Sequence, residues 1–264
     1  MINFDVEMNW TLAITGKGGV GKTTLAALAV RWLIEHNHAP VLAVDADPNT
    51  CLDAALGVKV ACTVGGAREE TKRIAQADSA GGMSKQELLD LKIQEALVES
   101  GNFDLLAMGR PEGPGCYCYA NNVLRSVLER LAGHYPTVVI DNEAGLENLS
   151  RRTTQRADWL VFVTEPSVRG LITARRLYDL ALEMQINASA MGVVVNRLRE
   201  NSALDRAREK FANTPVVILG GIPEDAELAA QDVDGAAIFT LPAENAAARA
   251  AAKIMEKLIL DFRF

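Results

Sequence analysis

The stretch Gly16–Thr24, GKGGVGKTT, constrains this chain more than any other. It matches the phosphate-loop pattern of Gly, any four residues, Gly-Lys and Ser or Thr. An apolar run at 10–15 precedes it, which is typical of a buried strand, and the run at 24–33 is typical of a helix. Glycines allow the tight turn that points backbone N–H groups at a phosphate, and the helix N-terminus adds partial positive charge. The sequence therefore predicts a strand, loop and helix that hold a nucleoside triphosphate.

Two side chains of this loop have expected roles of their own. We expect Lys22 to reach the β- and γ-phosphates and the hydroxyl of Thr23 to bind Mg²⁺. The predicted nucleotide-binding residues of the loop are Gly16, Lys17, Gly18, Gly19, Val20, Gly21, Lys22, Thr23 and Thr24.

Lys17, directly after the first glycine, narrows the class of loop. This arrangement resembles the deviant Walker A loop of the SIMIBI nucleotide hydrolases, which include the nitrogenase iron protein and the septum-site and plasmid-partition ATPases. In that class the equivalent lysine reaches the nucleotide of the other subunit. The resemblance therefore implies an ATP-dependent homodimer with Lys17 and Lys22 as catalytic residues.

Apolar runs alternate with helical patterns over the rest of the chain. We expect an α/β protein, a mostly parallel sheet flanked by helices, of the phosphate-loop NTPase class. With no repeat or composition break, residues 1–264 are expected to form one domain, with 1–9 as a loose leader or short strand. Residues 61–83 are expected to be a surface loop, and a helix begins after Ser84 with a capping box. The expected strands are 10–15, 41–44, 103–108, 137–141, 159–164, 191–195 and 216–219.

Composition and charge limit the classes of partner that this chain can be expected to bind. The net charge of −7 and the absence of a basic run argue against binding to nucleic acid or to an anionic membrane. We expect the Ala-rich helix at 243–260 to pack on the sheet rather than on a lipid surface. Four cysteines in 264 residues are not a disulfide framework, and no apolar run is long enough to span a bilayer. These features predict a soluble cytoplasmic protein with reduced thiols.

Carboxylates follow two of the expected strands. Asp141 ends a β-branched strand in the Walker B pattern, and we expect it to accept hydrogen bonds from the water shell of Mg²⁺. Asp45 and Asp47 follow the strand at 41–44, at the edge where α/β sheets bind ligands. By resemblance to the SIMIBI class, Asp47 is the catalytic position that orients the attacking water, and Asp45 supports the loop or the Mg²⁺ shell.

A pair of thiols follows the expected strand at 103–108. Glycines and prolines precede Cys116 and Cys118 and favour a shaped loop. Two thiolates alone rarely hold a metal, but one pair from each subunit of a dimer supplies four. The residues alone leave two readings open: a thiolate metal site on a dimer axis, or two loop cysteines without a ligand. We expect Cys51 to be a buried helix residue and Cys62 a loop thiol.

The segment 109–122, GRPEGPGCYCYANN, together with Gly16–Thr24, resembles the CooC-type nickel-insertion ATPases of carbon monoxide dehydrogenase and acetyl-CoA synthase maturation. The resemblance extends from about residue 10 to the end. It implies that Cys116 and Cys118 bind Ni²⁺, with Zn²⁺ as a substitute, between two subunits that use ATP or ADP and Mg²⁺. It also implies a client nickel enzyme, and the segment at 142–147 resembles switch II.

Two strand ends are expected to hold the adenine. In the SIMIBI class the Asn at the position of Asn196 hydrogen-bonds the base, and an amide suits this because it both donates and accepts. The segment 220–225 resembles the second adenine segment of the septum-site ATPases. The expected base-binding residues are Asn196, Arg197, Pro223 and Glu224.

The sequence thus favours an ATP-dependent nickel-insertion factor, with two rivals. An iron–sulfur scaffold or electron donor like the nitrogenase iron protein also uses four thiolates across a dimer. A positioning ATPase that binds membrane or DNA fits the acidic balance and the thiol pair less well. Nothing in the sequence distinguishes carbon monoxide dehydrogenase from acetyl-CoA synthase as the client.

Overall fold

The computed structural model describes residues 10–77, 82–110, 117–145 and 157–260, with the side chains of 117–122 and of Asp232 outside the description. Its strands form one eight-stranded sheet in the order β3-β4-β2-β5-β1-β6-β7-β8. Every neighbouring pair is parallel except β3 with β4. The strands are β1 Trp10–Gly16, β2 Val41–Ala46, β3 Leu97–Glu99, β4 Phe103–Ala107, β5 Thr137–Asn142, β6 Ala157–Thr164, β7 Ala188–Leu198 and β8 Val217–Pro223.

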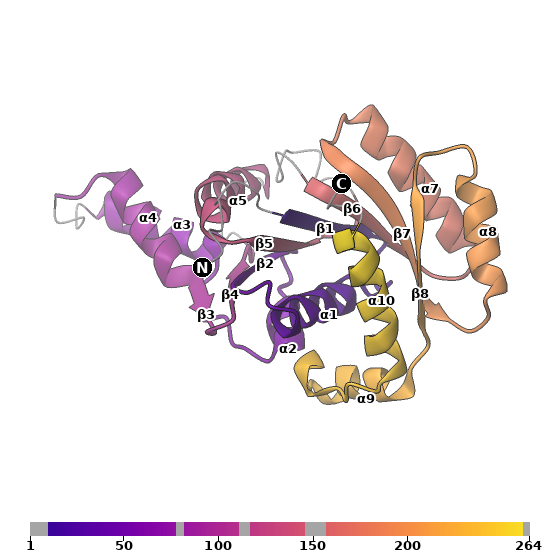
Figure 1. Cartoon of the computed structure of the whole chain (residues 1–264). Helices are drawn as coiled ribbons and strands as arrows, with labels where there is room; N and C mark the ends of the chain where they lie inside the picture. The colour runs from indigo at the N-terminus through magenta and orange to yellow at the C-terminus, as the bar shows by residue number, and fades with distance from the viewer. Residues whose placement is uncertain (1–9, 78–81, 111–116, 146–156, 261–264) are drawn as a thin grey trace, which may run out of the picture.

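Helices cover both faces of this sheet (Figure 1). α1 and α10 pack on one face, in a core shared with β1 and β6. On the other face, α3, α4 and α5 pack over β2, β4 and β5, and α7 and α8 over β6 and β7. The described helices are α1 Lys22–Glu35, α2 Leu52–Leu56, α3 Val64–Gln76, α4 Lys85–Ala96, α5 Tyr117–Leu131, η1 Ala132–His134, α7 Val168–Glu183, α8 Ser202–Phe211, α9 Ala226–Asp234, η2 Ile238–Thr240 and α10 Ala246–Leu260. The predicted α/β class is confirmed.

The parallel strands bring distant residues to one edge of the sheet. In the register, Ile14 of β1 lies opposite Asp141 of β5, and Asp45 of β2 lies opposite both Asp141 and Ala107 of β4. All residues of β2, β5 and β6 are buried, as expected for central strands covered on both faces. The carboxyl ends of β1, β5, β2 and β4 therefore form a continuous row.

The prediction of a surface loop at 61–83 is wrong, because α3 occupies residues 64–76. Thr63 caps it by accepting a hydrogen bond from Gly66 N at 3.1 Å. Val64, Ala67 and Thr71 are buried along one side of the helix. The two glycines lie in the first turn, and the charged residues lie on the outer side. The apolar face of this helix is narrow, so the sequence pattern did not indicate a helix.

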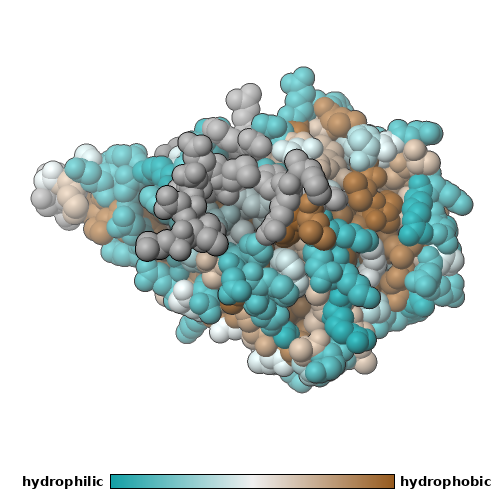
Figure 2. Space-filling model, in the orientation of Figure 1, coloured by the Kyte–Doolittle hydropathy of each residue, from teal (hydrophilic) through white to brown (hydrophobic). Residues whose placement is uncertain are grey.

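The helix expected after Ser84 is α4, and it ends at Ala96. Its predicted capping box is confirmed: Glu87 N donates to Ser84 Oγ at 3.2 Å, and Ser84 N donates to Glu87 Oε2 at 2.7 Å. The chain then turns into β3, which pairs antiparallel with β4. α3 and α4 project from this end of the molecule, and Figure 2 shows a mostly hydrophilic surface on the projection.

The C-terminal helix packs on the sheet as expected. α10 buries Ala247, Ala251, Ile254, Met255 and Leu258. Trp159 of β6 donates from Nε1 to the carbonyl of Leu258 at 3.1 Å, and Lys257 donates to the carbonyl of Leu219 at 2.7 Å. Among the described residues, no helix has the length and apolar character needed to cross a membrane.

Candidate nucleotide site

The predicted strand, loop and helix are confirmed at the phosphate loop. β1 ends at Gly16 and α1 begins at Lys22. Gly21 has a φ of +92°, and a Cβ there would lie 2.1 Å from Asn196 Nδ2. Asn196 donates from this nitrogen to the carbonyl of Val20 at 2.8 Å. The side chain of Asn196, near the end of β7, therefore holds the phosphate loop. Only glycine fits at position 21, the last residue before α1.

Lys22 and Thr23 begin α1 beside the Walker B strand. Lys22 is 8% exposed, and its Nζ lies 3.4 Å from the carbonyl oxygen of Lys17. Thr23 Oγ1 donates to Asp141 Oδ2 at 2.6 Å. The structure thus brings together the hydroxyl and the carboxylate for which we expected a shared Mg²⁺ role.

Asp141 is a buried carboxyl group with one uncompensated oxygen. Its Oδ1 is buried and has no hydrogen-bond partner among the described residues. Burial raises the pKa of Asp141 from 3.8 to about 7; the Thr23 hydrogen bond and Lys22 oppose this, and Asp45 and Asp47 add to it. Carboxylate and hydroxyl oxygens are the donors that Mg²⁺ takes, and a cation here would satisfy the orphaned oxygen. The residues present therefore fit Mg²⁺.

Asp45 organises the loop after β2. Its carboxylate accepts hydrogen bonds from the backbone N–H groups of Asp47, Cys51 and Leu52 at 3.0, 2.8 and 2.9 Å. Burial raises the pKa of Asp45, and these bonds oppose the rise. The predicted supporting role in the loop is confirmed.

Asp47 is half-buried and has a different set of partners. Its Oδ1 accepts from both the backbone N and the side-chain Nδ2 of Asn49, at 2.8 and 2.9 Å. Asn49 Oδ1 in turn accepts from Arg110 Nη2 at 2.6 Å. Our sequence reasoning missed Asn49 and Arg110 because the contact spans 61 residues and depends on β4 lying beside β2.

The switch II segment contacts the phosphate loop at its first residues. Gly145 N donates to the carbonyl of Gly16 at 3.2 Å, and Thr15 Oγ1 donates to the carbonyl of Gly145 at 2.7 Å. Asn142 Nδ2 donates to the carbonyl of Ile14 at 3.0 Å. Residues 146–156, with the rest of the expected switch, lie outside the described residues.

The four residues expected at the adenine lie on the neighbouring ends of β7 and β8. β7 runs to Leu198 rather than ending before Asn196. Asn196 is buried, whereas Arg197 is exposed with Nη1 3.9 Å from Glu165 Oε1. Pro223 ends β8, and exposed Glu224 accepts two hydrogen bonds from Arg199, at 2.6 and 2.9 Å. Arg199 lowers the pKa of Glu224.

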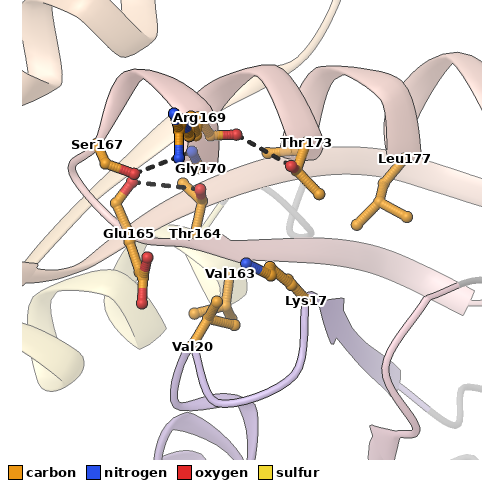
Figure 3. Close-up of a pocket in the computed structure, with 11 residues that line it drawn as sticks. Lys17, Val20, Val163, Thr164, Glu165, Ser167, Arg169, Gly170, Thr173 and Leu177 are labelled. Atoms are coloured by element: carbon orange, nitrogen blue, oxygen red, sulfur yellow. Dashed lines mark hydrogen bonds between the residues drawn. The ribbon is translucent and has the colours of Figure 1, made fainter.

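A cavity of about 150 Å³ lies between the phosphate loop and α7, on the β6 side of β1 (Figure 3). Lys17, which is exposed, and Val20 line it from the loop. Ser167 Oγ accepts from Gly170 N at 3.0 Å, which caps α7 at the cavity wall. The side chain of Lys17 therefore lies beside α7, on the opposite side of β1 from Asp141 and Asp45.

The expected thiol site is described only in part. α5 begins at Tyr117, so the backbone of Cys118 is in a helix and not in the shaped loop that we expected. After the last glycine at 115 no helix breaker remains, and Leu124 and Val127 bury the apolar side of the helix. Cys116 and the side chain of Cys118 lie outside the description. Among the described residues, no group of three or more His, Cys, Asp or Glu could hold a metal ion.

The two other cysteines differ from each other in environment. Cys51 precedes α2 and is exposed, so the prediction of a buried helix thiol is wrong. Cys51 is the residue just before the first turn of α2, and its backbone N–H donates to Asp45. Cys62 is partly buried just before α3.

Comparisons with known proteins agree with this geometry. Residues 11–238 match the CobQ/CobB/MinD/ParA nucleotide binding domain. The chain is 43% identical to an uncharacterized ATP-binding protein of Methanocaldococcus jannaschii, over 94% of this chain and 98% of that protein. It is 32% identical to the carbon monoxide dehydrogenase accessory protein CooC of Rhodospirillum rubrum, over 87% and 89% of the two chains. The septum site-determining protein MinD of Pyrococcus horikoshii, solved with Mg-ADP, superposes with a TM-score of 0.69 over 95% and 96% of the chains at 24% identity.

Fold and site together define a phosphate-loop nucleotide-binding protein with a mostly parallel sheet. More specifically, the chain belongs to the CobQ/CobB/MinD/ParA nucleotide-binding family, and it is an ATPase. The family's fold implies ATP or ADP with Mg²⁺ as ligands.

Proposed function

We propose that this ATPase is a nickel-binding maturation factor that inserts Ni into the active-site cluster of carbon monoxide dehydrogenase or acetyl-CoA synthase. One observation carries the proposal: the chain shares 32% identity with a carbon monoxide dehydrogenase accessory protein over most of both lengths. The position of β4 also supports it, because β4 lies next to β2 and the thiol-bearing segment leaves the sheet beside the loop of Asp47. Nickel is the cargo, and Zn²⁺ is a substitute ligand for the same thiols.

In the nucleotide half of this proposal, Lys22 binds the β- and γ-phosphates at the start of α1. Thr23 and Asp141 hold the Mg²⁺ with its water shell, and the buried unpartnered oxygen of Asp141 supports this assignment. Mg²⁺ supplies charge neutralisation at the phosphates when bound. We assign Asp47 to orient the attacking water, since it directly follows β2, two residues beyond Asp45, which lies opposite Asp141.

On the base side, Asn196 has a double role in the proposal. Its side-chain nitrogen holds the loop through Val20, which leaves the side-chain oxygen as an acceptor for the adenine amino group. Pro223 and Glu224 flank the base, with Arg197 at the rim. The two hydrogen bonds from Arg199 keep the Glu224 carboxylate in one orientation.

The metal half requires two copies of the chain. Lys17 crosses to the nucleotide of the partner, and one Cys116–Cys118 pair from each subunit supplies four thiolates. Thiolates must lose their protons to bind metal, so nickel affinity falls at low pH. Hydrolysis near Asp47 changes the distance between the two pairs, and nickel passes to the client enzyme.

The test is an anaerobic Ni²⁺ titration of the purified protein without nucleotide, with ADP and with a non-hydrolysable ATP analogue, with the mass measured in the same samples. We expect one Ni²⁺ per two chains and nucleotide-dependent dimerisation. Cys116→Ser with Cys118→Ser removes the nickel and spares ATP binding, whereas the control variant Cys51→Ser with Cys62→Ser keeps both.

Three results would decide against the proposal. Nickel retained by the Cys116→Ser, Cys118→Ser variant would remove the thiol assignment. A brown protein with visible absorption after anaerobic purification would favour the iron–sulfur alternative. The absence of tight Ni²⁺ binding in every nucleotide state would leave an ATPase without a nickel function.

A further inference from the structure

A chain of three side chains leads from the nucleotide site to the segment that follows β4. Asp47 accepts two hydrogen bonds from Asn49, and Asn49 accepts one from Arg110. The amide of Asn49 donates at one end and accepts at the other. If it were flipped, its oxygen would face the Asp47 carboxylate and its nitrogen would face the guanidinium group, so Asp47 and Arg110 together select one orientation.

The backbone around Arg110 is held on two sides. Met108 N donates to the carbonyl of Asp45 at 2.8 Å, and the carbonyl of Met108 accepts from Gly65 N of α3 at 2.9 Å. Gly109 has a φ of +64°, and a Cβ there would lie 2.3 to 2.6 Å from the side-chain atoms of Thr63. Arg110 therefore leaves a well-defined turn, between the end of β2 and the start of α3.

The strand order separates the phosphate loop from this turn. β5 and β2 lie between β1 and β4. Three strand spacings of about 4.8 Å place the two strand ends roughly 14 Å apart. Within the part of the chain that the structure describes, the loops at the ends of β5 and β2 lie between the phosphate loop and the turn, and the second of these carries Asp47 and Asn49.

We propose that Arg110 is a positioning residue that acts through Asn49 on Asp47, and that this contact links the nucleotide state to the segment following β4. The hydrolytic half of the inference rests on the proposed role of Asp47. Its consequence for nickel rests on the proposed function, because the thiols lie a few residues beyond Arg110 in sequence.

The first measurement is steady-state Mg-ATP hydrolysis by Arg110→Met, Asn49→Ala and the double variant. We expect each single change to lower kcat roughly tenfold by weakening the side-chain contact through Asn49 that orients the Asp47 carboxylate, with the KM for ATP within about twofold of the wild-type value. The double variant should be no slower than the slower single variant, because both changes break the same contact. Arg110→Lys should restore part of the rate. Arg208→Met is the matched control, since Arg208 is an exposed arginine hydrogen-bonded to Asp205 on the remote helix α8.

The second measurement is hydrogen exchange of residues 109–122, read by mass spectrometry with and without a non-hydrolysable ATP analogue and Mg²⁺. We expect the nucleotide to change the exchange of this segment in the wild type and in Arg208→Met. In Arg110→Met and Asn49→Ala the nucleotide effect should be lost, while bound nucleotide is retained.

Several outcomes overturn the inference. These are a wild-type kcat in Arg110→Met, a double variant whose loss equals the product of the two single losses, and a nucleotide effect on exchange that is absent in the wild type or unchanged in the variants. Asp47→Asn and the nickel titration separate the two assumptions. Unimpaired hydrolysis by Asp47→Asn would remove the role of Asp47 and with it the hydrolytic half of the inference, and a wild type that binds no nickel would remove only the proposed cargo.

Discussion

Asp141 makes the stability of the nucleotide-free protein depend on pH. Its pKa is about 7 in the folded chain against an ordinary value of 3.8, so between these values the folded state keeps a proton that the unfolded state has lost. The free energy of unfolding in EDTA should therefore fall as pH rises from about 4 to about 7, by at most roughly 4 kcal/mol from this group. Asp141→Asn should flatten the dependence, as measured by urea unfolding at pH 5, 6, 7 and 8.

Asp45 keeps some pH dependence in the free energy of unfolding of Asp141→Asn. Burial also raises the pKa of Asp45, so the same sign of pH dependence remains in Asp141→Asn with a smaller slope. Equal slopes in the variant and the wild type would show that Asp141 does not hold a proton in the folded state. Mg²⁺ with nucleotide should reduce the slope of the wild type, because a cation beside the carboxylate stabilises its charged form.

The stability losses caused by substitutions at Gly21 and Asn196 should depend on each other. Gly21→Ala places a Cβ against the Asn196 amide and forces a side chain into a positive φ, so we expect the protein to lose about 1 to 3 kcal/mol of stability together with ATP affinity. Adding Asn196→Ala removes the collision but not the backbone strain. Thermal unfolding of both single variants and the double variant checks this, and strictly additive losses would contradict the contact.

The residues of this site differ in how far the sequence could predict them. The phosphate loop and the aspartates after strands follow local patterns, so their positions were predictable. The contact from Asn49 to Arg110 was not, because it depends on which strands are neighbours. The bond from Asn196 to Val20 was missed for the same reason: it joins residues 176 positions apart.

At the scale of elements, α3 should respond to changes at its N-terminus. Thr63→Ala removes the side-chain cap and should cost about 1 kcal/mol. Gly109→Ala should cost about 1 to 3 kcal/mol from its positive φ, plus the collision with Thr63. Thr63→Gly removes every side-chain atom in the collision, so Gly109→Ala should be milder in that background. Urea unfolding of the wild type and of these four variants measures the costs, and an equal cost of Gly109→Ala in the wild-type and Thr63→Gly backgrounds would contradict the packing.

The predicted elements failed where tertiary contacts outweigh local preference. α3 has adjacent glycines and many charges, so its formation depends on its packing against the sheet and α4 together with its Thr63 cap. β3 is three residues long and continues the apolar spacing of α4, so only its pairing with β4 distinguishes it from helix. The long central strands and α10 were predictable because their patterns are strong and continuous.

At the scale of the whole molecule, a substitution of Lys17 tests whether two copies of the chain form a dimer when ATP is bound. If Lys17 reaches the partner's nucleotide, Lys17→Ala should bind ATP as a monomer and lose hydrolysis on the order of a hundredfold. Lys85→Ala, a change of an exposed lysine on α4, is the control and should behave as the wild type. Light scattering with a non-hydrolysable ATP analogue reports the mass, and a Lys17→Ala protein that still dimerises and hydrolyses ATP would contradict the proposed crossing.

The separation of β1 from β4 by two strands has a consequence for inhibition. A small molecule seated against Arg110 would lie roughly 14 Å from the phosphate loop, so it and ATP would fit on the protein together. We expect such a compound to be non-competitive with ATP: it would lower the maximal rate and leave the KM unchanged. High cellular ATP would then not displace it, in contrast to inhibitors that occupy the nucleotide site itself.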